Sequence, residues 1–218
     1  MKNIYTTLDT ETFGGAARPK GIYHLAGIIH YRNGKVLGTY NILIAEHYHE
    51  IETDSYAKKN FHKYEEMVAS GKVTMVATER DAIELVKRLF DFYGVTHCMA
   101  FNSGFDFTKT MCRELLENRE FVDLWLMACE TLATKKYRQY CMDNGFLSPS
   151  KKNCKSSAES FYSYLTQNPS YEEEHTAFED VLIEKAIFEA CVKTHKKFTR
   201  NIHFFDHPNK YNLYPKLV

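Results

Sequence analysis

The 218-residue chain is long enough for one large domain with a buried core, and its 44% hydrophobic and 26% charged residues exclude a disordered chain. The 28 basic and 28 acidic residues balance, which excludes a chain-wide positive field that would attract long duplex nucleic acid. Any contact with nucleic acid must therefore be local or carried by metal ions.

The cysteines and the apolar segments exclude further classes. The six cysteines have no C-x-x-C spacing, which argues against a zinc ribbon and against a secreted disulfide framework, so we expect reduced thiols. The opening MKNIYTTLDT lacks a signal-peptide pattern, and no apolar run approaches the ~20 residues of a membrane span. We expect an intracellular, cytoplasmic protein, in the host cytoplasm if a phage encodes it, without membrane contact.

Three strands and an insertion are expected first. The stretch IYTTLD, from Ile4, is typical of a strand, and residues 21–45 predict two more strands joined at Asn33-Gly34, a dipeptide favoured in two-residue hairpin turns. The polar residues 46–78 indicate a loop and a helix outside the main sheet. This insertion is either an active-site flap or a segment that only packs.

The middle of the chain alternates between helix and strand. Apolar residues recur at helical spacing over 79–93, and VTHCMAFN then predicts a buried strand. A second helical pattern begins at Phe107, so Asp106 lies where a strand gives way to a helix. Because the carboxyl ends of strands in open α/β sheets usually bind ligands, this position favours a site at Asp106.

The last third is expected to be a loop, a helix and a longer helix. Residues 142–157 are the most loop-like and locally basic, SAESFYSYL is helical, and residues 175–198 predict a long amphipathic helix. The aromatic, Pro-containing tail, residues 199–218, is expected to pack on a domain of residues 1–198.

Two acids in the first strand raise the question of metal binding. Asp9 and Glu11 are two residues apart, so in a strand they point to the same face. Neighbouring carboxylates repel each other, and a divalent cation would keep both ionised. A solvated strand end explains this short pair equally well.

Three more polar residues fall at element ends in a specific order. D-x-E at Asp9 is followed by N-x-x-x-D ending at Asp106, and then by His175 with Asp180 five residues later. This order resembles the DEDDh exonucleases, whose relatives include the epsilon proofreading subunit of bacterial DNA polymerase III, RNase T, oligoribonuclease and phage exonucleases. The resemblance extends from about Ile4 to about Ala190, and three weak motifs in the right order are specific together.

The resemblance implies an α/β, ribonuclease-H-like fold with a mixed five-stranded sheet flanked by helices. It also implies a metal-dependent 3′-to-5′ exonuclease that hydrolyses single-stranded nucleic acid, with DNA favoured, to nucleoside 5′-monophosphates. By carry-over, two divalent cations, Mg²⁺ or Mn²⁺, would be held by Asp9, Glu11, Asp106 and Asp180, and hard oxygen ligands suit these ions. His175 would be the general base, placed before the helix or at its opening.

Substrate contacts follow from the same resemblance. Thr10, Thr12 and Phe13 match family positions that meet the terminal nucleotide, and an aromatic ring can stack on a base without reading sequence. Asn102 matches the family asparagine. Phe13 could instead be a core or lid residue, and Asn102 could only hold a turn. Phe101 departs from the His found in many relatives, but no metal ligand is lost.

Two alternatives stay open. One is a ribonuclease of the oligoribonuclease or RNase T type, and the other is a nuclease-like binding subunit of a polymerase complex. The chain keeps all five functional groups of the family, which argues against a purely structural role. They are Asp9, Glu11, Asp106, His175 and Asp180. The expected partner is single-stranded nucleic acid with a free 3′ end, and the resemblance leaves open a polymerase partner or a homodimer.

Overall fold

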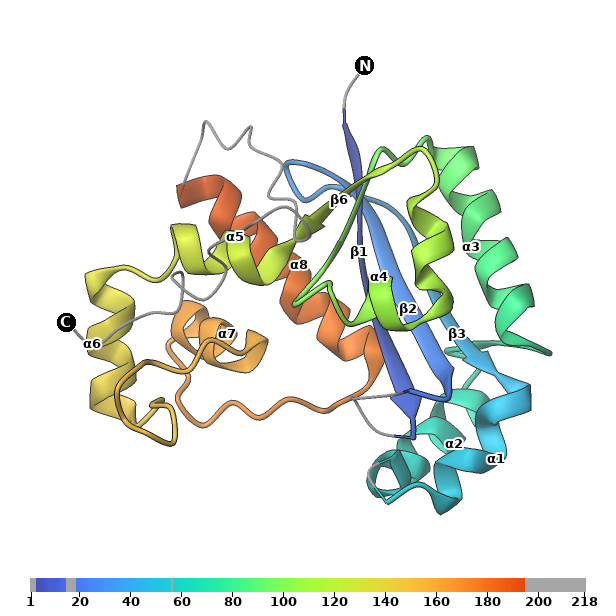
Figure 1. Ribbon diagram of the computed structural model, residues 1–218, viewed down its shortest axis with the longest axis horizontal. Helices are drawn as coiled ribbons and strands as arrows, with labels where there is room; N and C mark the ends of the chain where they lie inside the picture. Colours follow the sequence, from blue (N-terminus) through green and yellow to red (C-terminus); the bar gives the residue numbers. More distant parts are fainter. Residues whose placement is uncertain (1–2, 15–18, 56, 195–218) are drawn as a thin grey trace.

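A six-stranded mixed sheet with helices on both faces forms the centre of the protein (Figure 1). The computed structural model describes residues 3–14, 19–55 and 57–194. The strand order is β4-β3-β2-β1-β5-β6, in which β1 to β3 are antiparallel, β5 and β6 are parallel to β1, and β4 is parallel to β3. The strands are β1 (Ile4–Phe13), β2 (Gly21–Tyr31), β3 (Val36–Ile44), β4 (Thr74–Val76), β5 (His97–Ala100) and β6 (Glu120–Asp123). The predicted α/β class is confirmed.

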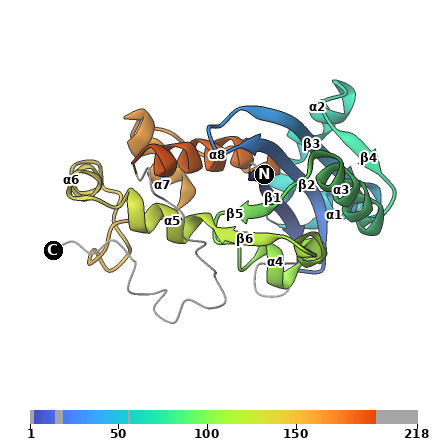
Figure 2. The same cartoon turned by 90° about the horizontal axis from the view of Figure 1, so that it is seen from above.

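Successive side chains of β1 point to opposite faces of the sheet and pack in different parts of the core. Leu8 packs in a cluster with α3 (Glu79–Tyr93), whereas the ring of Tyr5 lies 5.2 Å from that of Phe188 in α8 (Ala177–Thr194). Figure 2 shows α8 and α4 (Asp106–Lys109) on opposite sides of the sheet. Because strand side chains alternate, Asp9 and Glu11 share the face of Tyr5 and lie under α8.

The insertion after β3 is more ordered than the predicted loop and helix. It contains α1 (Ala45–Thr53), a 3₁₀ turn (Ala57–Asn60) and α2 (Phe61–Ala69), so the prediction of a loop at its start is wrong. Two widely spaced residues, Ile51 and Tyr64, anchor these helices in a small core with Tyr23 of β2. The insertion ends in β4, which adds a sixth strand at the edge of the sheet.

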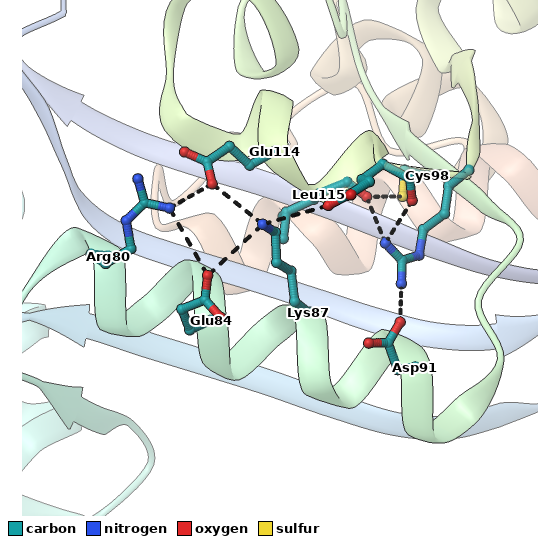
Figure 3. A network of polar contacts seen from close by, with 9 residues as sticks. Arg80, Glu84, Lys87, Asp91, Cys98, Glu114 and Leu115 are labelled. Atoms are coloured by element: carbon teal, nitrogen blue, oxygen red, sulfur yellow. Dashed lines mark hydrogen bonds and ion pairs between the residues drawn. The ribbon is translucent and has the colours of Figure 1, made fainter.

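The helix predicted from Phe107 is divided into two pieces. After α4, Thr110 has extended backbone (φ −119°, ψ 171°), and its hydroxyl accepts a hydrogen bond from the Cys112 N–H that opens a 3₁₀ helix (Met111–Leu116). Figure 3 shows how this 3₁₀ helix is tied to α3, because Glu114 accepts hydrogen bonds from Arg80 (2.5 Å) and Lys87 (3.3 Å). The result is a short α4 that places Asp106 at its first position.

Between β6 and residue 194, where the description of the chain ends, four helices follow. They are α5 (Leu124–Thr131), α6 (Lys135–Asn144), α7 (Ala158–Thr166) and α8. The loop expected over 142–157 starts only at Gly145, because α6 occupies the earlier positions. The helices predicted at SAESFYSYL and after His175 are confirmed.

Three sequence-based expectations concern the chain as a whole. All six cysteines are buried and unpaired, as expected for structural thiols. Within the described ranges, no helix combines the length and the apolar character needed to cross a bilayer. The tail at 199–218, which was expected to pack on the domain, lies outside the described residues.

Candidate active site

The acids predicted from three distant segments come together around β1, beside α8 and the start of α4. Carboxylate oxygens of Asp9, Glu11 and Asp180 lie within 4.8 Å of one another. Asp106, at the first position of α4, is close enough for its charge to raise the pKa of Asp9. The structure therefore gathers all four acids into one cluster.

Local structure fixes the direction of each carboxylate in β1 and α4. The β1–β2 register shifts between Glu11 and Thr12, a bulge of the kind that re-aims side chains beside functional sites. The Tyr23 hydroxyl donates to Glu11 Oε2 (3.5 Å). On the other side, Thr10 Oγ1 donates to Asp106 Oδ1 (2.6 Å), and Asp106 is only 2% exposed. Thr10 thus orients an acid of the cluster.

The cluster has the donor set that a hard divalent cation requires. Asp180 Oδ1 and Glu184 Oε2 are buried oxygens without a hydrogen-bond partner. A buried oxygen in that state costs free energy unless a cation compensates it, and Mg²⁺ and Mn²⁺ prefer carboxylate oxygens. The residues present fit such an ion.

A second group of possible metal ligands consists of Glu46, His47 and Glu79. Its carboxylates accept hydrogen bonds from backbone N–H groups. Glu46 Oε1 accepts the backbone N–H of Glu79 (2.6 Å), and Glu79 Oε2 accepts that of Ile22 (3.3 Å). His47 Nε2 lies 3.5 and 3.6 Å from the two carboxylates. Backbone donors explain this group without a metal ion, in contrast to the acidic cluster.

Burial and mutual repulsion raise the pKa of every acid in the cluster. Burial raises the pKa of Asp9 most, and the charges of Asp106 and Glu184 add to it. Burial raises the pKa of Glu11, with repulsion from Asp180. Burial also raises the pKa of Asp106 to about 7 against the hydrogen bond from Thr10, and that of Asp180 to about 8. Without a cation, these groups hold protons near neutral pH.

The metal-free protein is therefore expected to lose stability as the pH rises from about 7 to about 8, the pKa values of Asp106 and Asp180. The folded state binds more protons than the unfolded chain there, so the free energy of unfolding falls with rising pH. The buried His24 and His30, whose pKa values burial lowers to about 4, affect stability only below their unfolded value of ~6.5.

Thermal unfolding in EDTA across this pH interval measures the effect. The melting temperature should fall with pH in EDTA and change much less with Mg²⁺ present. A flat or rising melting temperature in EDTA would show that the carboxylates do not crowd one another as described.

His175 lies in the segment before α8, as predicted, and its backbone is held by the insertion. It has a positive φ of 53°, a conformation that few non-glycine residues adopt. Asn60 Nδ2 donates to the His175 carbonyl (3.1 Å), and Lys63 Nζ donates to the Glu174 carbonyl (2.6 Å). The His175 side chain is half exposed, with Nδ1 3.9 Å from Glu173 Oε2. The insertion thus contacts the segment that carries His175, beyond packing on the sheet.

A cleft of about 490 Å³ opens beside the acids and contains one of the predicted substrate residues. Asn102, with a positive φ of 58°, lines this cleft together with Asp9 and Asp180. Thr12 and Phe13 are partly buried at the end of β1, where the Phe13 ring lies 4.9 Å from that of His47. The hydroxyl of Thr10 points to Asp106 and is not among the cleft's lining groups.

Two acids in this cleft were missed from the sequence. Glu184 and Glu173 both line it. Glu184 follows Asp180 by four residues on α8, and residues four apart share one face of a helix. That spacing was the available signal, whereas Glu173 stood in an acidic run that suggested only a helix N-terminus.

The chain resembles known proteins in its fold and not in its sequence. No protein-family model matches the sequence, and no curated protein matches it. Among solved structures, exonuclease I of E. coli in complex with a dA16 oligonucleotide is 14% identical with a TM-score of 0.53, covering 89% of this chain and 42% of that chain. Exonuclease I from Methylocaldum szegediense is 15% identical with a TM-score of 0.55, covering 89% and 41%.

A third structure, an ExoI/SSB-Ct complex, is 13% identical with a TM-score of 0.53, covering 90% of this chain and 42% of that chain. The chain thus spans less than half the length of the exonuclease I chains that it matches. At these identities the likeness shows the fold, and the predicted ribonuclease-H-like fold is confirmed, with β4 as an added edge strand.

Proposed function

We propose that the protein is a metal-dependent 3′-to-5′ exonuclease that hydrolyses single-stranded DNA to nucleoside 5′-monophosphates. The observation that carries the proposal is the convergence of acids from β1, α4 and α8, with buried carboxylate oxygens that lack partners. The likeness to exonuclease I, in complexes with dA16 and dT13 oligonucleotides, supports single-stranded DNA as the substrate.

In this proposal the cluster is a cation site. Asp9, Glu11, Asp106 and Asp180 hold two Mg²⁺ or Mn²⁺ ions with their oxygens. When bound, the ions supply an activated water and neutralise charge at the phosphate and the leaving 3′ oxygen. They also supply positive charge locally in a chain whose net charge is zero.

The remaining residues position and activate the reactants. His175 accepts the proton of the attacking water, and its Nδ1 lies 3.9 Å from Glu173 Oε2. Asn102 contacts the terminal nucleotide at the cleft, and Thr12 and Phe13 contact it from the end of β1, with the Phe13 ring available for stacking on a base. Thr10 acts indirectly by holding Asp106.

A degradation assay tests the proposal. Single-stranded DNA and RNA of one sequence, labelled at the 5′ end, are incubated with the protein in Mg²⁺, Mn²⁺ or EDTA. We expect a ladder of 5′-labelled DNA products and free nucleoside 5′-monophosphates with either metal, and none in EDTA. Faster cleavage of RNA would favour the ribonuclease alternative. Intact oligonucleotide under every metal condition would favour the binding-subunit alternative and contradict the exonuclease.

Loss of the contacts from the insertion should lower turnover. In Asn60→Ala and Lys63→Met, the segment of His175 loses one of its two side-chain anchors. We expect kcat to fall by about 10- to 100-fold, because small displacements of a catalytic group carry costs of this size. Mn²⁺ affinity should stay at the wild-type value in Asn60→Ala, whereas Lys63→Met also removes a positive charge that acts on Asp180.

The matched control is Lys58→Met, which removes an exposed lysine from the same insertion. It should cleave DNA at the wild-type rate. Wild-type kcat in both anchor variants would mean that the insertion does not position His175.

A further inference from the structure

Glu184 is an acid of the cleft beyond the four that the family resemblance implies. It follows Asp180 by one helical turn on α8, so both side chains leave the helix on the same side. It is only 3% exposed and lines the same cleft as Asp9 and Asp180. Its carboxylate therefore lies at the inner end of the acidic cluster.

Packing alone does not explain an acid at this position. Glu184 Oε2 has no hydrogen-bond partner, and none of the ion pairs among the described residues includes Glu184. The Glu184 carboxylate has a hydrogen bond with the backbone of Phe101. Its neighbours Ile183 and Ile187 on α8 are buried in the core, where an apolar side chain would avoid the cost of a buried, unpaired carboxylate.

Glu184 shares the cleft with two acids of the cluster. Asp9, Asp180 and Glu184 all line it, and carboxylate oxygens of Asp9 and Asp180 lie within 4.8 Å of one another and of Glu11. The charge of Glu184 raises the pKa of Asp9, as does that of Asp106. Glu184 thus belongs to the same group of acids as the predicted ligands.

We propose that Glu184 is a fifth carboxylate ligand of the cation site that Asp9, Glu11, Asp106 and Asp180 form. The inference rests on the proposed function, since it assigns a residue to the same two-cation site. Glu184 Oε2, which is buried without a hydrogen-bond partner, is the atom that would bind the ion.

Mn²⁺ binding to Glu184→Gln, followed by the electron paramagnetic resonance of free Mn²⁺, tests the proposal. Gln keeps the size of the side chain but removes the charge. We expect the wild type to bind two ions and Glu184→Gln to bind one of them about 10- to 100-fold more weakly, by analogy with the loss of groups that support metal ligands. Glu189→Gln is the control, because Glu189 lies on the same helix and pairs with Lys185; it should bind both ions normally.

Unfolding in EDTA separates a ligand from a structural residue. If Glu184 is a ligand, its Oε2 has no partner in the metal-free protein, so Glu184→Gln, which keeps the side-chain volume, should melt no lower than wild type in EDTA, and Mg²⁺ should stabilise it less. A structural role gives the opposite, a lower melting temperature in EDTA with unchanged Mn²⁺ affinity, and would overturn the inference. If the wild type cleaves DNA while the variant binds both ions normally, this inference fails alone. If the wild type neither binds Mn²⁺ nor cleaves DNA, the proposed function fails with it.

Discussion

Asp9→Asn is expected to reduce the cleavage of 5′-labelled single-stranded DNA by at least about 10³-fold. Carboxylate oxygens of Asp9, Glu11 and Asp180 lie within 4.8 Å of one another, and Asp106 is close enough for its charge to raise the pKa of Asp9, so the loss of Asp9 weakens the cation site. Metal ions supply several kcal/mol of transition-state stabilisation, and each 1.36 kcal/mol corresponds to a factor of ten in rate. Single-turnover cleavage with saturating protein measures the effect on the chemical step.

The same variant has a second expected property, a higher melting temperature in EDTA. Burial and neighbouring charges raise the pKa of Asp9, so the folded metal-free protein loses free energy in keeping this carboxyl protonated near neutral pH. Asn carries no charge at any pH, so the metal-free variant should be more stable than wild type. Asp143→Asn, at an exposed position near the end of α6, should change neither property. Turnover in Asp9→Asn at the wild-type rate would contradict the assignment of the site.

His175→Ala is expected to slow hydrolysis by about 10²- to 10⁴-fold, the usual contribution of a general base. His175 stands in the segment before α8, outside the group of oxygens that gathers around Asp9, so Mn²⁺ affinity and DNA binding should be retained. Cleavage rates, Mn²⁺ titration and DNA binding in Ca²⁺ measure the three properties on one preparation.

His62→Ala provides the control, because His62 is exposed on α2 of the insertion. It should behave as wild type. A large loss of Mn²⁺ affinity in His175→Ala would make His175 a ligand instead of a base, and an unchanged rate would remove it from the mechanism.

The sequence predicts the site wherever the regular spacing of a strand or helix determines the side to which a residue points. The two-residue period of a strand places Asp9 and Glu11 on one face, and the end of β5 followed by a helix start places Asp106 at the same edge of the sheet. The five-residue step from His175 to Asp180 requires that one of them stand outside the helical face, and His175 does precede α8.

The rest depends on contacts that no local pattern encodes. The insertion looks polar because Ile51 and Tyr64, its two anchors, are far apart in sequence and meet only in the fold. Thr110 interrupts an otherwise helical pattern through its own side-chain cap. In the sequence, Glu184 stands among the apolar residues of an amphipathic helix, which gives no sign of a site. It lies near the other acids because α8 packs over β1.

The most direct test of the cation site is a crystal soaked in Mn²⁺ and measured for anomalous scattering. We predict a manganese ion among the carboxylates of Asp9, Glu11 and Asp180, and a second ion beside Asp106. Anomalous maps without an ion at either position, with the four carboxylates turned away from one another, would contradict it.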